Sequence, residues 1–123
     1  MILVDTSVWV DHLRKGSPMM RRLLENRAVL SHPLVIGELA MGQLHPREAI
    51  LELLRKLPVT VEADHDEVLH FITHHKLYGT GIGYIDAHLL AAVRLTSGAT
   101  LWTRDKRLAK VAEALNLAFV PTP

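Results

Sequence analysis

The stretch MILVDTSVW, residues 1–9, joins a short apolar run directly to a carboxylate, Asp5, and then to two hydroxyl side chains. Residues 2–4 have the composition of a strand that is buried on both faces, as strands of parallel sheets are. Helical periodicity begins at Val8, so Asp5 stands at the junction of a predicted strand and a predicted helix. In open α/β sheets, ligands bind outside the carboxyl ends of the strands, which is where this carboxylate is expected.

The rest of the chain alternates short apolar runs with longer stretches of helical periodicity. Further strands are predicted at residues 28–30, 58–61, 99–102 and 117–120. Helices are predicted at residues 8–15, 19–26, 33–41, 46–57, 64–77, 84–96 and 107–115. Strands separated by helices predict a parallel sheet that is covered by helices on both faces.

The composition is that of an ordinary globular domain, with 49% hydrophobic and 22% charged residues in a chain of 123. The chain has no cysteine, which excludes a disulfide scaffold, a cysteine zinc site and a thiol nucleophile. It shows neither a signal peptide nor an apolar run near the roughly 20 residues of a membrane span, so a cytoplasmic protein is expected. Its net charge of +1 requires any phosphate-binding surface to be local.

A second acid stands in an equivalent place near the other end of the chain. Asp105 follows the predicted strand 99–102 by three residues, in the segment TRD. The carboxyl ends of parallel strands meet at one edge of the sheet. Asp5 and Asp105 are therefore expected to face the same ligand-binding edge.

Two further acids lie inside apolar helical patterns. Glu38 is surrounded by apolar residues in LVIGELAMG, and Asp86 begins the nearly unbroken apolar run of GYIDAHLLAAV. Helices that are apolar around most of their circumference are buried, and an isolated buried carboxylate is costly or becomes neutral. Carboxylates that converge on one point repel one another, and a divalent cation removes that repulsion. Hard oxygen ligands favour Mg²⁺ or Mn²⁺, so the four acids predict a metal site.

Each of these acids also has a simpler interpretation. Asp5 and Asp105 could each cap the helix that follows, because Asp is a good N-cap residue. Asp86 could complement the dipole of a first helical turn, and Glu38 could be exposed if its helix lies on the surface. The remaining acids are typical of helix starts or solvated helix faces and are left out of the predicted site: Asp64, Asp66, Glu67, Glu25, Glu48, Glu52 and Glu113.

Other classes of site have less support. His70 and His74 share a helix face, but they lack the glutamate of an HExxH zinc site and an evident third ligand. A haloacid-dehalogenase-type phosphatase needs a second Asp two residues after the first, where this chain has Ser7. The phosphate-binding pattern GxxxxGK followed by Ser or Thr does not occur, and the phospho-acceptor pattern of a flavodoxin-like regulatory domain is missing.

Taken together, the segments that carry the acids resemble the motifs of the PIN-domain ribonucleases. These segments are an apolar run ending in DTS, then GELAMG, then DAHLLAA and finally LWTRDKRL, in this order along essentially the whole chain. The sequence is similar above all to the VapC-type toxins of bacterial and archaeal toxin–antitoxin pairs. The resemblance implies an α/β fold, a three-layer α/β/α sandwich around a parallel twisted sheet, with residues 1–123 forming one PIN domain.

The same resemblance implies which residues form the site. Four residues match the acidic positions of the family: Asp5, Glu38, Asp86 and Asp105. The three aspartates are the expected metal ligands, whereas Glu38 could bind a second ion, position the water or act as a base. Thr6 or Ser7, together with Thr103, would fill the polar positions beside these acids and orient them. Leu108 departs from many relatives, which carry Phe there, and this changes the volume at a packing position.

The activity implied is hydrolysis of RNA phosphodiester bonds by a water that Mg²⁺ or Mn²⁺ activates. Substrate phosphates require cations, and three basic residues flank the fourth acid: Arg104, Lys106 and Arg107. Any one of them could instead belong to a solvated helix face. The alternative function is a non-catalytic PIN-like module that binds RNA or protein without cutting it.

The resemblance also implies protein partners. A cognate antitoxin is expected to lay its C-terminal segment in a groove near the active site, and a second copy of the chain is expected to form a homodimer. The predicted helices at residues 8–15, 19–26 and 46–57 are crowded with apolar residues, which such contacts would cover. A core of this size could also absorb them. No membrane partner is expected.

Overall fold

The computed structural model describes residues 1–121, which form three strands and seven helices. The strands are β1 (Ile2–Val4), β2 (Val29–Leu30) and β3 (Thr100–Trp102). The helices are α1 (Thr6–Lys15), α2 (Pro18–Glu25), α3 (Pro33–Ala40), α4 (Arg47–Lys56), α5 (His65–His74), α6 (Tyr84–Leu95) and α7 (Lys106–Ala114). The predicted α/β fold class is therefore confirmed.

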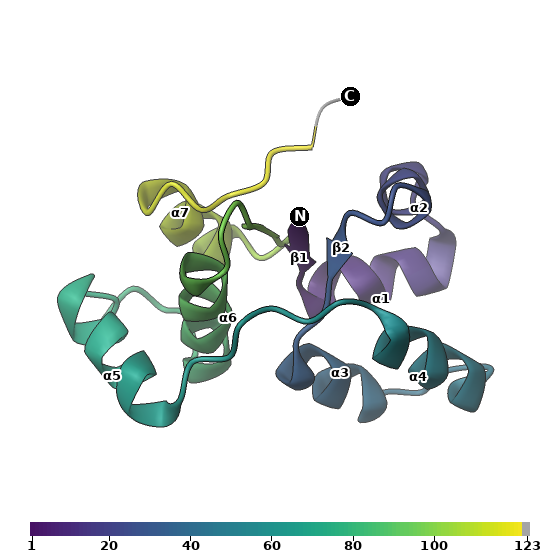
Figure 1. Cartoon of the computed structure of the whole chain (residues 1–123), viewed down its shortest axis with the longest axis horizontal. Helices are drawn as coiled ribbons and strands as arrows, with labels where there is room; N and C mark the ends of the chain where they lie inside the picture. Colours follow the sequence, from purple (N-terminus) through teal and green to yellow (C-terminus); the bar gives the residue numbers. More distant parts are fainter. Residues whose placement is uncertain (122–123) are drawn as a thin grey trace.

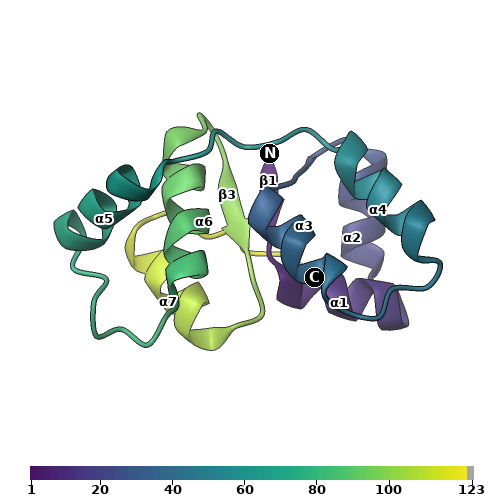
Figure 2. The same ribbon diagram turned by 90° about the horizontal axis from the view of Figure 1, so that it is seen from below.

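The strands form one parallel sheet in the order β2-β1-β3. β1 is central, and its three apolar residues are buried because neighbours cover it on every side. Helices α1–α4 lie on one side of the strands and α5–α7 on the other, with α6 alongside β3 (Figures 1 and 2). This is the expected three-layer arrangement.

The strand order reverses at β1. The chain leaves β1 for β2 on one side through α1 and α2, and it later passes back to β3 on the other side of β1. Such a reversal opens a crevice at the carboxyl ends of the two strands involved, here β1 and β3. The backbone N–H of Asp5 donates to the carbonyl of Trp102 at 2.9 Å, which holds the segments after these strands side by side.

Two predicted strands are shorter than expected. Residues 58–61 make a single bridge, between Ser31 and Val59, and residues 117–120 make another, between Leu101 and Ala118. Pro58 has no N–H to donate to a ladder. The side chains on either side of Thr60 are about half exposed, so only one face of this segment has packing to support a strand. The prediction of full strands at these two places is wrong.

Local sequence accounts for the helix starts that matter for the site. Asp64 and Glu67 form the predicted capping box of α5. The ring Nδ1 of His32 accepts the N–H of Leu34 at 3.0 Å and caps α3. α5 ends at His74, short of the predicted Leu77, because Lys76 adopts a positive φ of 53°.

Within residues 1–121, no helix has both the length and the apolar character needed to cross a membrane.

Candidate functional site

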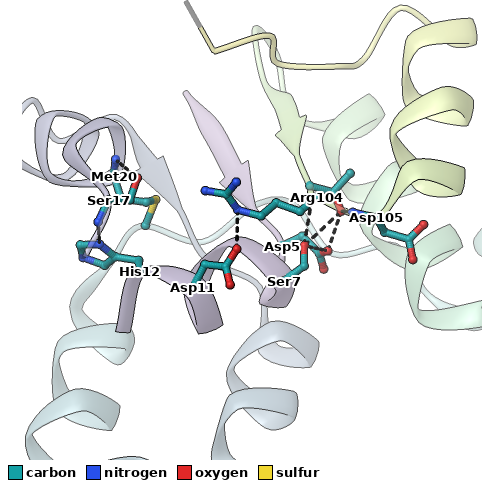
Figure 3. Close-up of polar contacts among 9 residues, drawn as sticks. Asp5, Ser7, Asp11, His12, Ser17, Met20, Arg104 and Asp105 are labelled. Carbon is teal, nitrogen blue, oxygen red and sulfur yellow. Dashed lines mark hydrogen bonds and ion pairs between the residues drawn. The ribbon is translucent and has the colours of Figure 1, made fainter. Parts of the chain in front are cut away.

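Asp5 is buried at the end of β1, with 7% of the residue exposed. Its Oδ2 accepts hydrogen bonds from the hydroxyls of Ser7 at 2.8 Å and Thr103 at 2.7 Å. Asp5 occupies the N-cap position of α1, but its side chain makes no capping hydrogen bond. The carboxylate is thus oriented toward the segment after β3, and it does not cap α1 (Figure 3).

Ser7 and Thr103 join the segments that follow β1 and β3. The two hydroxyls lie 3.3 Å apart. Ser7 Oγ accepts the N–H of Arg104 at 3.0 Å, and Thr103 Oγ1 accepts the N–H of Asp105 at 3.1 Å. These bonds place Asp105 next to Asp5, although the two residues are a hundred positions apart in the sequence.

Asp105 is exposed and caps α7. Its Oδ1 accepts the N–H groups of Arg107 at 2.9 Å and Leu108 at 3.0 Å. The capping interpretation of this residue is therefore correct. It engages only one of the two carboxylate oxygens, so it does not compete with a second role.

Asp86 lies in the first turn of α6 and is half-buried. Its Oδ2 accepts the N–H of Gly83 at 3.0 Å. Burial raises the pKa of Asp86, the Gly83 hydrogen bond opposes this, and the charges of Asp5, Asp105 and Glu38 raise the pKa further. The other three carboxylates therefore lie close enough to act on Asp86, and the four predicted acids are brought together.

Glu38 is exposed, which corrects the expectation of a buried carboxylate. Val35 and Leu39 take the buried face of α3, and Glu38 is left on the outer face of its last turn. Its Oε1 accepts the hydroxyl of Thr6 at 2.7 Å. Thr6 thus donates a hydrogen bond to Glu38, whereas Ser7 and Thr103 donate hydrogen bonds to Asp5.

The four carboxylates share one feature that bears on cation binding. Each uses one oxygen in the hydrogen bonds above, and no group within residues 1–121 donates to the other oxygen. Nowhere in that range are three acidic or imidazole groups already arranged around a common point as ligands. Two of the acids, Glu38 and Asp105, are exposed, so an ion can reach their second oxygens from solvent. An all-oxygen, acidic set of this kind fits Mg²⁺ or Mn²⁺, which keep several water ligands.

The basic residues near Asp105 differ in what they contact. Arg104 forms an ion pair with Asp11 (Figure 3), in which its Nε lies 2.9 Å from a carboxylate oxygen. The guanidinium of Arg104 also lies over the ring of Trp102. The side chain of Arg107 lies against Gly81, where a Cβ atom would come within 3.0 Å of it. Lys106 is exposed at the start of α7. The Asp11–Arg104 pair was not anticipated, because no sequence spacing relates two residues so far apart.

The raised pKa of Asp86 has a consequence for stability. The folded chain binds a proton at Asp86 more tightly than the unfolded chain does. The stability due to that proton is complete below the ordinary pKa of 3.8 and is lost as the pH rises through the raised pKa. We therefore expect Asp86→Asn, which keeps an acceptor for Gly83, to raise the free energy of unfolding in EDTA at pH 7.

Urea unfolding at several pH values between 4 and 7 measures this effect. The gain of Asp86→Asn over the wild type should shrink as the pH falls. Glu113→Gln, at an exposed acid near the far end of α7, should show no such pH-dependent gain. An Asp86→Asn protein that is less stable than the wild type at pH 7 in EDTA would show that the charges do not repel as described.

Comparison with known proteins identifies the family. The PIN domain model matches residues 2–114. The chain is 49% identical over 108 residues to Ribonuclease VapC32 of two Mycobacterium tuberculosis strains, and the match covers 88% of this chain and 87% of the relative.

Two solved structures share the fold. PAE2754 from Pyrobaculum aerophilum has a TM-score of 0.64 at 19% identity, covering 93% of this chain and 90% of its own. FitAcB from Neisseria gonorrhoeae has a TM-score of 0.63 at 20% identity, and the match covers 92% of this chain and 94% of the FitAcB chain. This chain therefore belongs to the PIN-domain family and, within it, to the VapC-type ribonucleases.

Proposed function

We propose that the protein is a Mg²⁺- or Mn²⁺-dependent endoribonuclease and the toxin of a type II toxin–antitoxin pair. The observation that carries this proposal is the acidic cluster at the carboxyl ends of β1 and β3, where each carboxylate keeps one oxygen without a hydrogen bond from any of residues 1–121. The identity of 49% to a relative that is named a ribonuclease supports RNA as the substrate. With an RNA substrate, the protein would act in the cytoplasm.

The aspartates of the cluster would hold the ion through their free oxygens, at Asp5, Asp86 and Asp105. When bound, the ion supplies a water of lowered pKa and neutralises charge that builds on the scissile phosphate. Ser7 and Thr103 fix the plane of the Asp5 carboxylate, so its free oxygen keeps one direction. Glu38, which accepts a hydrogen bond from Thr6 at the exposed side of the cluster, would then accept a proton from the attacking water.

Two of the three predicted cations remain available for the RNA backbone. Arg104 is paired with Asp11, so its charge is partly neutralised before any substrate arrives. Arg107 lies between Asp105 and the glycine-rich loop that leads into α6, and Lys106 is exposed beside it. We assign these two residues to phosphate contacts, which supply affinity and orientation but no choice of sequence.

Metal removal tests the proposal directly. The purified protein, freed of any co-purified antitoxin, is expected to cleave total or structured RNA in Mg²⁺ or Mn²⁺. EDTA should lower the rate by a factor of about 100 or more, because the ion contributes several kcal/mol to the transition state. Excess Mg²⁺ should restore it. Cleavage that continues unchanged in EDTA would overturn the metal mechanism. Cleavage that never appears with either metal would favour the non-catalytic binding module.

The proposed antitoxin has a suitable place to bind. A groove of about 340 Å³ begins at Glu38 and runs between α1 and the segment that follows α3. Its lining is largely apolar, with contributions from Val10, Leu13, Leu39, Leu44 and Ile50. An amphipathic segment could bury its apolar side there, and a basic side chain at its end would reach the acidic cluster and compete with the ion.

A homodimer is part of the same proposal. Leu69 on α5 and Leu95 on α6 are each 45% exposed, and the two helices pack against each other. A second copy of the chain could cover these two exposed leucines, which are not part of the lining of the groove beside Glu38.

A further inference from the structure

Three buried polar atoms have no hydrogen-bond partner in the protein within residues 1–121. They are Nε2 of His32, Oγ1 of Thr60 and Nδ1 of His88. The residues His32 and Thr60 are 2% and 5% exposed, so bulk water does not reach them. A buried polar group left without a partner destabilises the folded chain. Such a cost at three groups requires an explanation in the fold.

The three residues are neighbours in the fold. The rings of His32 and His88 face each other edge-on, with centres 6.3 Å apart. Ser31 pairs with Val59, and the N–H of Thr60 donates to the carbonyl of Ser31 at 3.1 Å. Since side chains alternate along extended segments, the residues after Ser31 and after Val59 point to the same face of the sheet. Thr60 and His32 therefore both point to the face that α6 covers.

The two imidazoles cannot satisfy each other directly. A ring nitrogen lies less than one ring bond length from its ring centre, so a centre distance of 6.3 Å keeps the two nitrogens beyond the hydrogen-bond range of about 2.7–3.2 Å. Nδ1 of His32 accepts the N–H of Leu34, so it carries no proton. The proton of the neutral ring is then on Nε2, which makes this unpartnered atom a donor.

That tautomer also decides what kind of group fits between the rings. A metal ion at Nε2 of His32 would need a lone pair there and would force the proton onto Nδ1, against the Leu34 N–H. A neutral molecule that both donates and accepts meets no such conflict. Buried waters typically make about three hydrogen bonds to groups that are otherwise unsatisfied.

We propose that His32, Thr60 and His88 bind one buried water molecule, which accepts from His32 Nε2 and bonds to Thr60 Oγ1 and His88 Nδ1. The water joins the start of α3 to the second turn of α6. These are the helices that carry Glu38 and Asp86. From His88 the network continues through the Tyr84 hydroxyl at 3.1 Å to Nδ1 of His65 at 2.5 Å, on α5. His32, Thr60 and His88 are thus positioning residues for two of the four acids, a part of the inference that rests on the proposed function.

The effect of Thr60→Val on stability should have opposite signs for a site that holds the water and for a dry site. The reason is that valine has nearly the same shape as threonine and lacks the hydroxyl. If the water is bound, the variant loses one of its hydrogen bonds, and the folding equilibrium constant should fall by about 3- to 10-fold in urea unfolding. If the site is dry, the variant removes an unsatisfied hydroxyl, and stability should rise. A rise overturns the proposal.

Two further measurements complete this test. Thr80→Val, whose hydroxyl donates to the Leu77 carbonyl, calibrates the loss of one partnered hydroxyl. A crystal structure of the wild type should show a water peak within about 2.7–3.2 Å of all three atoms. Such a structure with no peak there would overturn the proposal, whatever the stability data. Both readouts are independent of RNA cleavage, so they hold even if the proposed function fails.

The positioning role has its own readout. In the cleavage assay, Thr60→Val should raise the Mg²⁺ concentration for half-maximal rate several-fold, whereas Thr60→Ser, which keeps the hydroxyl, should stay close to the wild type. A merely structural role would lower stability and leave the Mg²⁺ requirement unchanged. That outcome would overturn the positioning role and leave the water site intact.

Discussion

Asp5→Asn is expected to lower the rate of RNA cleavage by at least about 100-fold, because loss of an outer-shell partner of a metal ligand alone costs 10- to 100-fold. The substitution keeps the shape of the side chain and an oxygen that can accept from Ser7 and Thr103. It replaces the free Oδ1 by an amide nitrogen, which has no lone pair for an ion. The charge that would hold the ion at the switch point of the sheet is lost with it.

Cleavage of the same RNA by both proteins at saturating Mg²⁺ measures this loss, and calorimetric titration with Mn²⁺ measures the change in ion affinity. Asp66→Asn makes the same chemical change at an exposed acid in the first turn of α5, and its rate should match the wild type. Equal rates for Asp5→Asn and the wild type would show that the acidic cluster is not the catalytic centre. A lost rate with unchanged Mn²⁺ affinity would place the ion elsewhere.

Leu90→Ala is expected to lower the free energy of unfolding by about 2–5 kcal/mol, the range for removing a buried leucine side chain from a packed core. Leu90 has 0% of its surface exposed and lies in α6, the helix whose first turn contains Asp86. The loss combines the transfer of apolar surface with a cavity that a rigid α/β/α sandwich cannot close completely.

Urea unfolding in the presence of EDTA measures this effect without a contribution from bound ions. Leu53→Ala is the matched control, because Leu53 is also a leucine in a helix, α4, but is 66% exposed. Its cost should be much smaller. Equal costs at the two positions would mean that α6 does not pack against the sheet as described.

The parts of the fold that depend on local sequence were predictable. β1 is apolar at every position, and the capping box at Asp64 and Glu67 marks the start of α5 without reference to the rest of the chain. The edge segments near Val59 and Ala118 were not predictable, because the number of bridges depends on how far the neighbouring strands extend. Composition alone does not carry that information.

The candidate site was also predictable only in part from the sequence. The four acids were predicted from their places at strand ends and in apolar helices, and the structure brings them together. The exposure of Glu38 was missed, because its helix segment is apolar in composition and only the packing of Val35 and Leu39 shows which face is buried. The pairing of Thr6 with Glu38 joins residues 32 positions apart, and no spacing in the sequence indicates such a contact.

The single bridges at Val59 and Ala118 also bear on how the chain behaves when it is concentrated. A sheet with long open edges offers unpaired N–H and C=O groups to which another chain can add a strand. Here each outer segment contributes one bridge, and prolines stand close by at Pro58 and Pro121, where no N–H is available. The edges of this sheet are therefore poor templates for recruiting other chains, so misassembly through strand addition is disfavoured even when no partner protein covers the molecule.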